Sequence, residues 1–200
     1  TLLSNTLKFL EKKKIEQVVI NIHYLGNQIT EYIKKNKFNI KINLIEEKDE
    51  ILDTGGGVLN AISNFDNEPF LIINPDTIWN ENYLVELNKM EKQFFSNKKN
   101  KCCMLVVNKK KSFDKSFKGD FNLVDKIINR GKDGDDLIYI YTGLQIIAPE
   151  VFSGQNKKIF SINEIWDRLI DNNQLHGISS SINFLHISDL KVYNNLKKIF

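Results

Sequence analysis

Residues 69–79 have the sequence PFLIINPDTIW, in which the apolar run FLIIN at 70–74 stops abruptly at Pro75-Asp76. A continuous apolar run of this kind is typical of a strand that is buried on both faces. A helical pattern follows over roughly 82–95, with its apolar residues gathered on one face. We therefore expect 70–74 to be a central strand, the most water-shielded of the chain, which leads through a loop into a helix.

Strands and helices alternate on both sides of this segment. Further strands are predicted at 17–22 (QVVINI), 40–45 (IKINLI), 102–108 (CCMLVVN), 137–147 (LIYIYTGLQII), 175–180 and 183–187, with a short hairpin around Gly119-Asp120-Phe121 in the polar stretch 109–136. Further helices are predicted over roughly the first dozen residues with Ser4 as a possible cap, around Ile29–Ile33, after Gly57, around Ile162–Leu169 and over 189–199.

This order predicts a three-layer, Rossmann-like α/β domain with a mostly parallel central sheet. The strand 17–22 is β-branched and continuous, which suits burial on both faces. Right-handed crossovers would place the carboxyl ends of 17–22, 40–45 and 70–74 along one edge of the sheet. Ligands of open α/β sheets bind along that edge, so we look for functional residues there.

The composition bounds the class of protein. A length of 200 residues suits one compact domain, and 42% hydrophobic with 26% charged residues excludes a wholly disordered chain. No run approaches about 18 apolar residues, so we expect neither a membrane-spanning helix nor a membrane partner. The N-terminal sequence lacks the basic-then-apolar order of a signal peptide. Cys102 and Cys103 are adjacent in an apolar stretch, which favours a reduced, cytoplasmic protein over a disulfide framework.

The charge balance argues against a nucleic-acid partner. Lys and Arg number 28 against 25 Asp and Glu, a formal net charge of +3. Arg130 and Arg168 are the sole arginines of the sequence. Nucleic-acid grooves usually recruit arginine for bidentate contacts, and that supply is nearly absent here. The lysine runs therefore indicate solvated faces.

The segment DTGGG at 53–57 places three consecutive glycines ahead of a predicted helix. Glycines have no Cβ atom, so their backbone N–H groups would be open to an anionic oxygen or a planar base. The alternative is a flexible turn that merely begins the helix. The spacing matches neither a dinucleotide fingerprint nor a P-loop, so neither is inferred.

Asp76 follows the most apolar strand directly, in the segment Asn74-Pro75-Asp76. A carboxylate at the carboxyl end of a strand is well placed to hold Mg²⁺, which prefers carboxylate, water and phosphate oxygens. An aspartate that caps the loop is the alternative, because many strand-to-helix junctions use one. The residue by itself does not decide between the two.

Thr142-Gly143 interrupts the predicted strand 137–147. A glycine inside a strand weakens it unless another backbone or a ligand approaches closely. The pair therefore indicates either the border of a binding site or a bulge without a ligand.

In combination, these segments resemble the sugar-phosphate nucleotidylyltransferase family. The similarity is greatest to the short branch of N-acetylmuramate-1-phosphate uridylyltransferases and mannose-1-phosphate guanylyltransferase-like proteins. The matching stretches are VVINIHYLGNQI (18–29), EEKDEILDTGGGVLNAI (46–62), PFLIINPDTIW (69–79), GDFNL (119–123), YTGLQIIAPEVF (141–152) and FSINEIWDRLI (160–170). The resemblance covers nearly the whole sequence, in the order that the family has.

The resemblance assigns roles to particular residues. It implies that Thr54, Gly55, Gly56 and Gly57, with Asn74, border the nucleotide, that Asp76 binds catalytic Mg²⁺ beside Asn74 and Trp79, and that Thr142, Gly143 and, more loosely, Gly119 and Asp120 border the sugar phosphate. Asn163 or Glu164 is expected to face the same pocket. Residues 1–108 would then form the nucleotide-binding half of a single domain and 109–200 the sugar-phosphate-binding half.

The family's reaction implies the partners. A sugar-1-phosphate oxygen attacks the α-phosphorus of a nucleoside triphosphate, and pyrophosphate leaves. The implied product is a nucleotide-sugar, most readily from uridylyl transfer to N-acetylmuramate 1-phosphate or a related sugar of cell-wall synthesis. The expected partners are a nucleoside triphosphate and a sugar 1-phosphate, with Mg²⁺, in a monomer or homodimer.

Two departures from the family matter. The family begins with a strand and a GxGTRLxP loop, followed by a lysine segment, whereas Thr1-Leu2-Leu3 matches the helix that comes after them. We therefore expect an N-terminally truncated chain that is inactive as given, or a degenerate homologue. Near the other end, His186 occupies the position of a family metal-binding aspartate, and imidazole suits Mn²⁺ or Zn²⁺ better than Mg²⁺. A catalytically inactive sugar-nucleotide-binding homologue or regulatory subunit is the alternative function.

Overall fold

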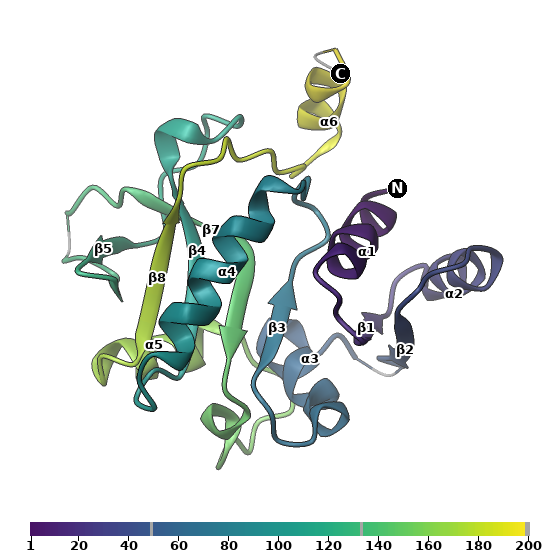
Figure 1. Ribbon diagram of the computed structural model, residues 1–200, viewed down its shortest axis with the longest axis horizontal. Helices are drawn as coiled ribbons and strands as arrows, with labels where there is room; N and C mark the ends of the chain where they lie inside the picture. Colours follow the sequence, from purple (N-terminus) through teal and green to yellow (C-terminus); the bar gives the residue numbers. More distant parts are fainter. Residues whose placement is uncertain (49, 133, 199–200) are drawn as a thin grey trace.

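The computed structural model describes residues 1–48, 50–132 and 134–198 (Figure 1). Its helices are α1 (Leu2–Lys12), α2 (Gly26–Lys35), α3 (Asp53–Ala61), α4 (Asn82–Phe95), α5 (Asn163–Asp171) and α6 (Leu190–Leu196), with short 3₁₀ helices η1 (Ile62–Phe65), η2 (Lys109–Lys111) and η3 (Pro149–Phe152). Its strands are β1 (Gln17–Ile22), β2 (Lys41–Glu46), β3 (Phe70–Ile73), β4 (Cys102–Asn108), β5 (Asn122–Val124), β6 (Ile127–Asn129), β7 (Tyr139–Ile147) and β8 (Leu175–Ser180). Most of the predicted elements are confirmed.

The strands form two separate sheets. β1 and β2 pair in parallel, and the other six have the order β3-β7-β4-β8-β6-β5. Between the named strands of the larger sheet, as far as the structure describes them, β4 and β8 are the one parallel pair. The α/β class is confirmed, but the sheet is mixed rather than mostly parallel. The physical reason is that β7 follows a hairpin instead of a helical crossover, and parallel neighbours need a crossover.

The position of β3 differs from the prediction. β3 is one of the two edge strands of the larger sheet, and Leu71, Ile72 and Ile73 are only half-buried. The most buried strand is β4, in which every residue from Cys102 to Val107 has an exposed fraction of 0%. β1 is also half-buried over most of its length. The expectation that the carboxyl ends of β1, β2 and β3 share one sheet edge is therefore wrong.

Helices cover the larger sheet in a three-layer arrangement. α4 crosses in front of it in Figure 1 and packs against β4, β7 and β8. α5 packs against β6 and β8 and also contacts α3. The core between α4 and the sheet is mostly apolar, with Met90 at 0% and Leu87 at 1% exposure, and it also includes the buried carboxylate of Glu86. α1, β1, β2 and α2 gather to one side, beyond β3 (Figure 1).

Several local predictions are corrected. Thr1, not Ser4, caps α1, and its hydroxyl accepts a hydrogen bond from the Ser4 amide. The hairpin lies at β5–β6, where Asp125 and Lys126 supply the two positive φ angles of its tight turn.

The C-terminal predictions also change. Residues 183–187 form isolated bridges rather than a strand. The helix expected over 189–199 spans Leu190–Leu196, and residue 199 lies outside the described residues. Among the residues that the structure describes, no helix is both long and apolar enough to cross a membrane.

Candidate functional site

A cavity of about 210 Å³ opens beside the middle of β7. It is walled by the residue after β3, by β7, by the first turns of α5 and by the segment after β8. Of the residues predicted from sequence, its lining includes Asn74, Asp120, Thr142, Gly143, Asn163 and His186. The aromatic side chains of Phe117, Phe121, Tyr141, Trp166 and Phe184 form much of the remaining wall.

A bulge in β7 shapes this cavity. The register between β4 and β7 shifts at Thr142-Gly143, so neither residue has a partner on β4. Gly143 has a φ of +87°, and a Cβ atom there would lie 2.7 Å from Cβ of Asn74. The Asn74 amide donates to the Gly143 carbonyl at 2.8 Å. The glycine thus permits the close backbone approach that its place in a strand indicates.

The side chains around the bulge hold it in place. The Thr142 hydroxyl donates to the Leu105 carbonyl, and the Thr142 carbonyl accepts from the Thr77 hydroxyl, each at 2.9 Å. The Asp120 carboxylate accepts from the Tyr141 amide at 2.9 Å. Asp120 therefore has a structural role as well as a place in the cavity wall.

Gly119 lies outside the cavity lining that the described residues form. Its φ is +98°, and a Cβ atom there would lie 2.2 Å from the Leu137 carbonyl oxygen. The glycine is required by this close contact between two chain segments. The structure therefore explains Gly119 without a ligand.

Asp76 lies beside His186, which lines the cavity. Their Oδ1 and Nδ1 atoms lie 3.5 Å apart, and both atoms are buried without a hydrogen-bond partner among the described residues. The backbones are held together by the Ile187 amide, which donates to the Asp76 carbonyl at 2.8 Å. The His186 ring stacks on Phe184 with a centroid distance of 5.6 Å, which fixes its orientation.

Tyr141 adds a third buried polar atom without a partner. Tyr141 lines the same cavity, and its hydroxyl has no hydrogen bond within the described residues. Burial raises the pKa of this phenol well above its ordinary range, with smaller contributions from Cys102 and Asp76. The hydroxyl therefore remains a proton donor near neutral pH. Buried polar atoms are normally hydrogen-bonded, so unpaired ones in a cavity indicate a place where a ligand or water binds.

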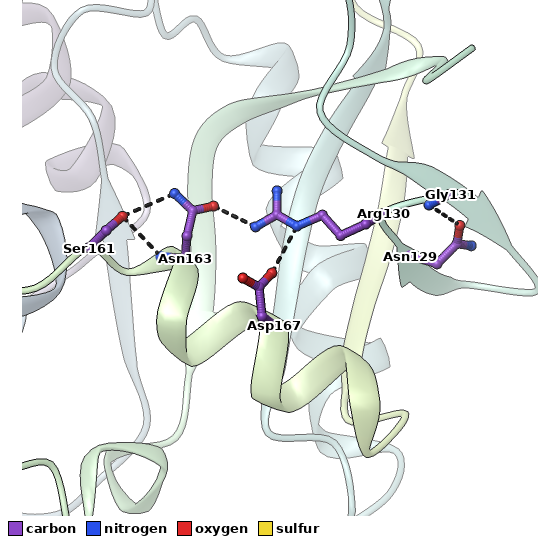
Figure 2. A network of polar contacts seen from close by, with 6 residues as sticks. All are labelled: Asn129, Arg130, Gly131, Ser161, Asn163 and Asp167. Atoms are coloured by element: carbon purple, nitrogen blue, oxygen red, sulfur yellow. Dashed lines mark hydrogen bonds and ion pairs between the residues drawn. The ribbon is translucent and has the colours of Figure 1, made fainter. Parts of the chain in front are cut away.

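Arg130 supplies positive charge to the cavity (Figure 2). Its Nε donates to Oδ1 of Asp167 at 2.9 Å, and one terminal nitrogen donates to Oδ1 of Asn163 at 2.5 Å. The guanidinium lies over the Phe121 ring, 4.5 Å from the centroid. Asn163 in turn donates to the Ser161 hydroxyl at 3.0 Å. Figure 2 shows the second terminal nitrogen pointing away from these partners, so it remains able to donate.

The pair of Asp76 and His186 fits a divalent cation in part. Two ligands that are each about 2.1 Å from one ion lie about 3.0 to 3.4 Å apart for coordination angles of about 90 to 109°. The observed 3.5 Å is close to that separation. Within the described residues, no group of three or more His, Cys, Asp or Glu side chains could hold an ion. Substrate and water oxygens would have to complete the coordination.

The predicted glycine segment is organised differently from the expectation. Gly55, Gly56 and Gly57 are buried inside α3, and the amides of Gly55 and Gly56 donate to the Phe160 carbonyl at 2.9 and 3.1 Å. A Cβ atom on Gly56 would lie 2.2 Å from the Lys158 carbonyl oxygen. The expectation that these amides are open is wrong, because they serve close packing against the 158–160 segment.

Thr54 connects this segment to the cavity. Its hydroxyl accepts from the Ile162 amide at 3.0 Å, directly before Asn163. The glycines themselves do not line the cavity as the described residues form it. The structure therefore brings most of the predicted sugar-side residues together with His186, which lies beside Asp76, and leaves the glycines outside the cavity lining that the described residues form.

The sequence analysis missed Arg130 and Tyr141. Arg130 is one of only two arginines, and a rare residue type in a polar stretch was the signal that could have identified it. Tyr141 directly precedes the Thr-Gly pair. Trp79, the predicted neighbour of Asp76, is a core residue with 1% exposure, and its indole N–H donates to the Asn74 carbonyl at 2.9 Å.

Two proteins with similar sequences have names that describe sugar-phosphate nucleotidyltransferases. The chain is 23% identical over 192 residues to N-acetylmuramate alpha-1-phosphate uridylyltransferase of Caulobacter vibrioides, covering 94% of this chain and 79% of that protein. It is 34% identical over 88 residues to D-glycero-alpha-D-manno-heptose 1-phosphate guanylyltransferase of Aneurinibacillus thermoaerophilus, covering 44% of this chain and 36% of that protein. No family model matches the chain.

Solved structures share the fold. The crystal structure of HddC from Yersinia pseudotuberculosis superposes with a TM-score of 0.72 at 18% identity, covering 100% of this chain and 85% of that chain. The same protein has been solved in complex with GMP-PN. In fold, and in sequence over nearly its whole length, the chain resembles the sugar-phosphate nucleotidylyltransferases, as its motifs predict.

Proposed function

We propose that the chain is a nucleotidyltransferase that couples a nucleoside triphosphate to a sugar 1-phosphate, with the sugar phosphate bound in the β7 cavity. The observation that carries this proposal is that His186 and Tyr141, each with an unpaired buried polar atom, line the cavity together with Arg130, and that Asp76, with a third such atom, lies beside His186. An anionic, hydroxyl-rich ligand would satisfy all of them at once. The names of the similar proteins agree with this reaction class.

The reaction would need positioning and charge neutralisation from the protein. A phosphate oxygen of the sugar 1-phosphate attacks the α-phosphorus, a new P–O bond forms, and the bond to pyrophosphate breaks. Arg130 would hold the attacking phosphate through its free terminal nitrogen, and the Tyr141 hydroxyl would donate to the same ligand. No protein nucleophile is required, so orientation and electrostatics would supply most of the rate.

Asp76 and His186 would hold the divalent cation of this reaction. We propose Mg²⁺ as the physiological ion on the grounds of the Asp76 carboxylate, with Mn²⁺ favoured by the imidazole. The bound ion would neutralise phosphate charge. The short contact between the two segments, through the Asp76 carbonyl and the Ile187 amide, would keep both side chains in position.

For the substrates, we propose uridylyl transfer to N-acetylmuramate 1-phosphate or a related sugar, in a cytoplasmic, cell-wall-related pathway. The support is the similarity to the uridylyltransferase of Caulobacter vibrioides over 94% of this chain. Residues 1–108 would hold the nucleotide, with Thr54 and Asn74 as the residues of this half nearest the site. Residues 109–200 would hold the sugar phosphate.

Thermal-shift titration of this chain tests the proposal directly. Sugar 1-phosphates should raise the melting temperature in the presence of Mn²⁺ or Mg²⁺, because a ligand that binds only the folded state stabilises it. The unphosphorylated sugars are the matched control and should have a much smaller effect. Equal shifts with and without the phosphate would contradict the placement of the phosphate beside Arg130.

The alternative is a sugar-nucleotide-binding homologue without turnover. The specific observation in its favour is that His186 lies beside Asp76 where the resemblance implies a second metal-binding aspartate, and imidazole is a poor ligand for Mg²⁺. The reading frame ahead of Thr1 discriminates between the two functions. A GxGTRLxP-like segment there supports the enzyme, and its absence supports the binding homologue.

A further inference from the structure

Glu86 is a buried carboxylate that lies outside the β7 cavity as the described residues form it. It belongs to α4, and its exposed fraction is only 2%, although the other buried side chains of this helix are aromatic or aliphatic. Among the described residues, it is the sole acidic side chain that is buried. Burying a carboxylate is costly unless the carboxylate is paired, so its partners indicate what it is used for.

The partners of Glu86 meet at the residue that follows β8. Its Oε1 atom accepts from both the amide and the hydroxyl of Ser181, at 3.2 and 3.3 Å. Its Oε2 atom accepts from the ammonium group of Lys89 at 3.0 Å, one turn further along α4. The Ser181 carbonyl in turn accepts from Lys111 at 2.9 Å. Ser181 is therefore held from α4 on one side and from η2 on the other.

The residue that Glu86 holds is the first of the segment that carries His186. We call residues 181–187 the β8 extension. Figure 1 shows this segment passing near the start of α4. The β8 extension is not a strand, and its pairing is limited to isolated bridges at Phe184 and His186. Because it makes so few sheet contacts, its course depends on how its two ends are held.

The far end of the β8 extension is bonded to the segment that carries Asp76. The Leu185 carbonyl accepts from the Ile78 amide at 2.9 Å, and the Ile187 amide donates to the Asp76 carbonyl at 2.8 Å. These two hydrogen bonds lie on either side of His186. They therefore report whether the imidazole and the Asp76 carboxylate are held next to each other.

The helix that holds Ser181 also holds the other segment. Asp76 lies in the loop that leads into α4, and Trp79 of that loop is buried. Tyr83, in the first turn of α4, packs edge-on against the Trp79 ring with a centroid distance of 4.9 Å. Glu86 follows one turn after Tyr83. α4 is therefore a common base, which contacts the Asp76 side through Tyr83 and the His186 side through Glu86.

We propose that Glu86 is a positioning residue of the cation site, which anchors the β8 extension to α4 and so holds His186 beside Asp76. This role rests on the proposed function, because that function places a cation between the two side chains. Glu86 does not itself contact the cation. Without its carboxylate, the Ser181 amide and hydroxyl would be left without their acceptor, and the extension would lose its anchor on α4.

The first test measures hydrogen exchange in the metal-free protein. Glu86→Leu removes the acceptor but keeps a side chain of good helix propensity. Exchange at the Ile78 and Ile187 amides should quicken by about tenfold or more, because their hydrogen bonds open more often without the anchor. Glu86→Gln keeps an acceptor oxygen and should leave both rates within about twofold of the parent rates. Unchanged exchange in Glu86→Leu, or equal quickening in both variants, overturns the proposal.

The second test uses Mn²⁺ as the probe. Pulsed electron paramagnetic resonance detects the nitrogen of an imidazole bound to Mn²⁺, so the parent protein and Glu86→Gln should show a nitrogen coupling that His186→Ala abolishes. Glu86→Leu should lose most of this coupling and bind Mn²⁺ about tenfold more weakly, because the imidazole is no longer held in place. Full coupling in Glu86→Leu overturns the proposal.

Met90→Ala is the matched control for a loss of stability alone. Met90 has an exposed fraction of 0% and lies on the same helix, so its truncation should lower the melting temperature. It should leave the nitrogen coupling intact, and a loss equal to that in Glu86→Leu overturns the proposal. If Glu86→Leu fails to fold, Ser181→Ala removes one of the two donors and should change both measurements by about threefold. No change in Ser181→Ala then has the same negative meaning.

The two tests separate this role from the proposed reaction. A parent protein without nitrogen coupling contradicts the cation site itself, and the role of Glu86 at that site falls with it. Coupling that is present in the parent protein and retained in Glu86→Leu contradicts the role of Glu86 alone.

Discussion

The Nδ1 atom of His186 lies 3.5 Å from the Oδ1 atom of Asp76, and neither atom has a hydrogen-bond partner among the described residues. The two residues are 110 positions apart in the sequence, one after β3 and one after β8. A single isolated bridge between Thr77 and His186 brings their segments together. This relationship is the structural basis for the proposed cation site, and it leads to the first prediction.

Asp76→Asn should weaken Mn²⁺ binding by about tenfold or more, because an amide oxygen carries no charge to offset the cation. The measurement is the electron paramagnetic resonance signal of free Mn²⁺ during titration of the protein. Asp171→Asn, at the exposed end of α5, is the control and should leave the affinity unchanged. Equal Mn²⁺ affinity in the Asp76→Asn variant and the parent protein would remove Asp76 from the site.

Arg130→Lys should lower the affinity for a sugar 1-phosphate by about tenfold, because an ammonium group cannot reproduce the planar donor geometry of a guanidinium. Calorimetric titration gives the dissociation constant directly. Glu164→Gln is a matched control on α5, because it removes only a surface ion pair with Lys157. An unchanged affinity in Arg130→Lys would mean that the phosphate binds elsewhere.

Gly143→Ala should destabilise the fold by about 2 kcal/mol or more, because the new Cβ would have a positive φ and overlap Asn74. Gly134→Ala is the control, since Gly134 has a φ of +89° but nothing within 4 Å of the added Cβ. Its cost should be about 1 kcal/mol, the penalty for the left-handed conformation alone. Urea unfolding measures both. Equal destabilisation would show that Asn74 does not restrict this position.

Gly56→Ala should destabilise the protein by about 2 kcal/mol, although alanine is the better helix former, because its Cβ would overlap the Lys158 carbonyl. Gly26→Ala at the start of α2 meets only ordinary contacts with Ile22 at 3.4 Å and beyond. That substitution should change stability by no more than about 0.5 kcal/mol. Thermal unfolding of the two variants compares them. A stabilising Gly56→Ala would show that α3 is not packed tightly against residues 158–160.

Stability should fall as the pH rises from 9 toward 12, because burial raises the pKa of Cys103 from 9.0 to about 12 and also raises that of Cys102. Below pH 9 both thiols are protonated in both states, so their contribution is fully present. Above it the unfolded state releases protons that the native state keeps, which favours unfolding. Urea midpoints measured across this range test the direction. Cys103→Ala should reduce the slope, and an unchanged slope would contradict the assignment to this thiol.

Part of the site was predictable from sequence because motifs are local. Thr142-Gly143 was singled out by its residue types and Asn74 by the family resemblance of its segment, and the structure places them in contact through the bulge in β7. Arg130 was not, because its relation to Asn163 depends on how the β5–β6 hairpin packs beside α5. The glycines of α3 were predicted to contact a ligand, but the amides of Gly55 and Gly56 donate to the Phe160 carbonyl instead. Phe160 lies more than one hundred residues later in the chain, so no local pattern indicates this contact.

By itself, the sequence determined the order of the helices and strands and the approximate bounds of most of them, because hydrophobic periodicity is set by neighbouring residues. β1, α4 and β4 follow their predicted ranges for this reason. Only the tertiary structure decided that β3 lies at a sheet edge, that β7 runs antiparallel to β3 and β4, and that His186 reaches Asp76. Strand order and such contacts depend on packing between segments far apart in the chain, and no local pattern encodes that packing.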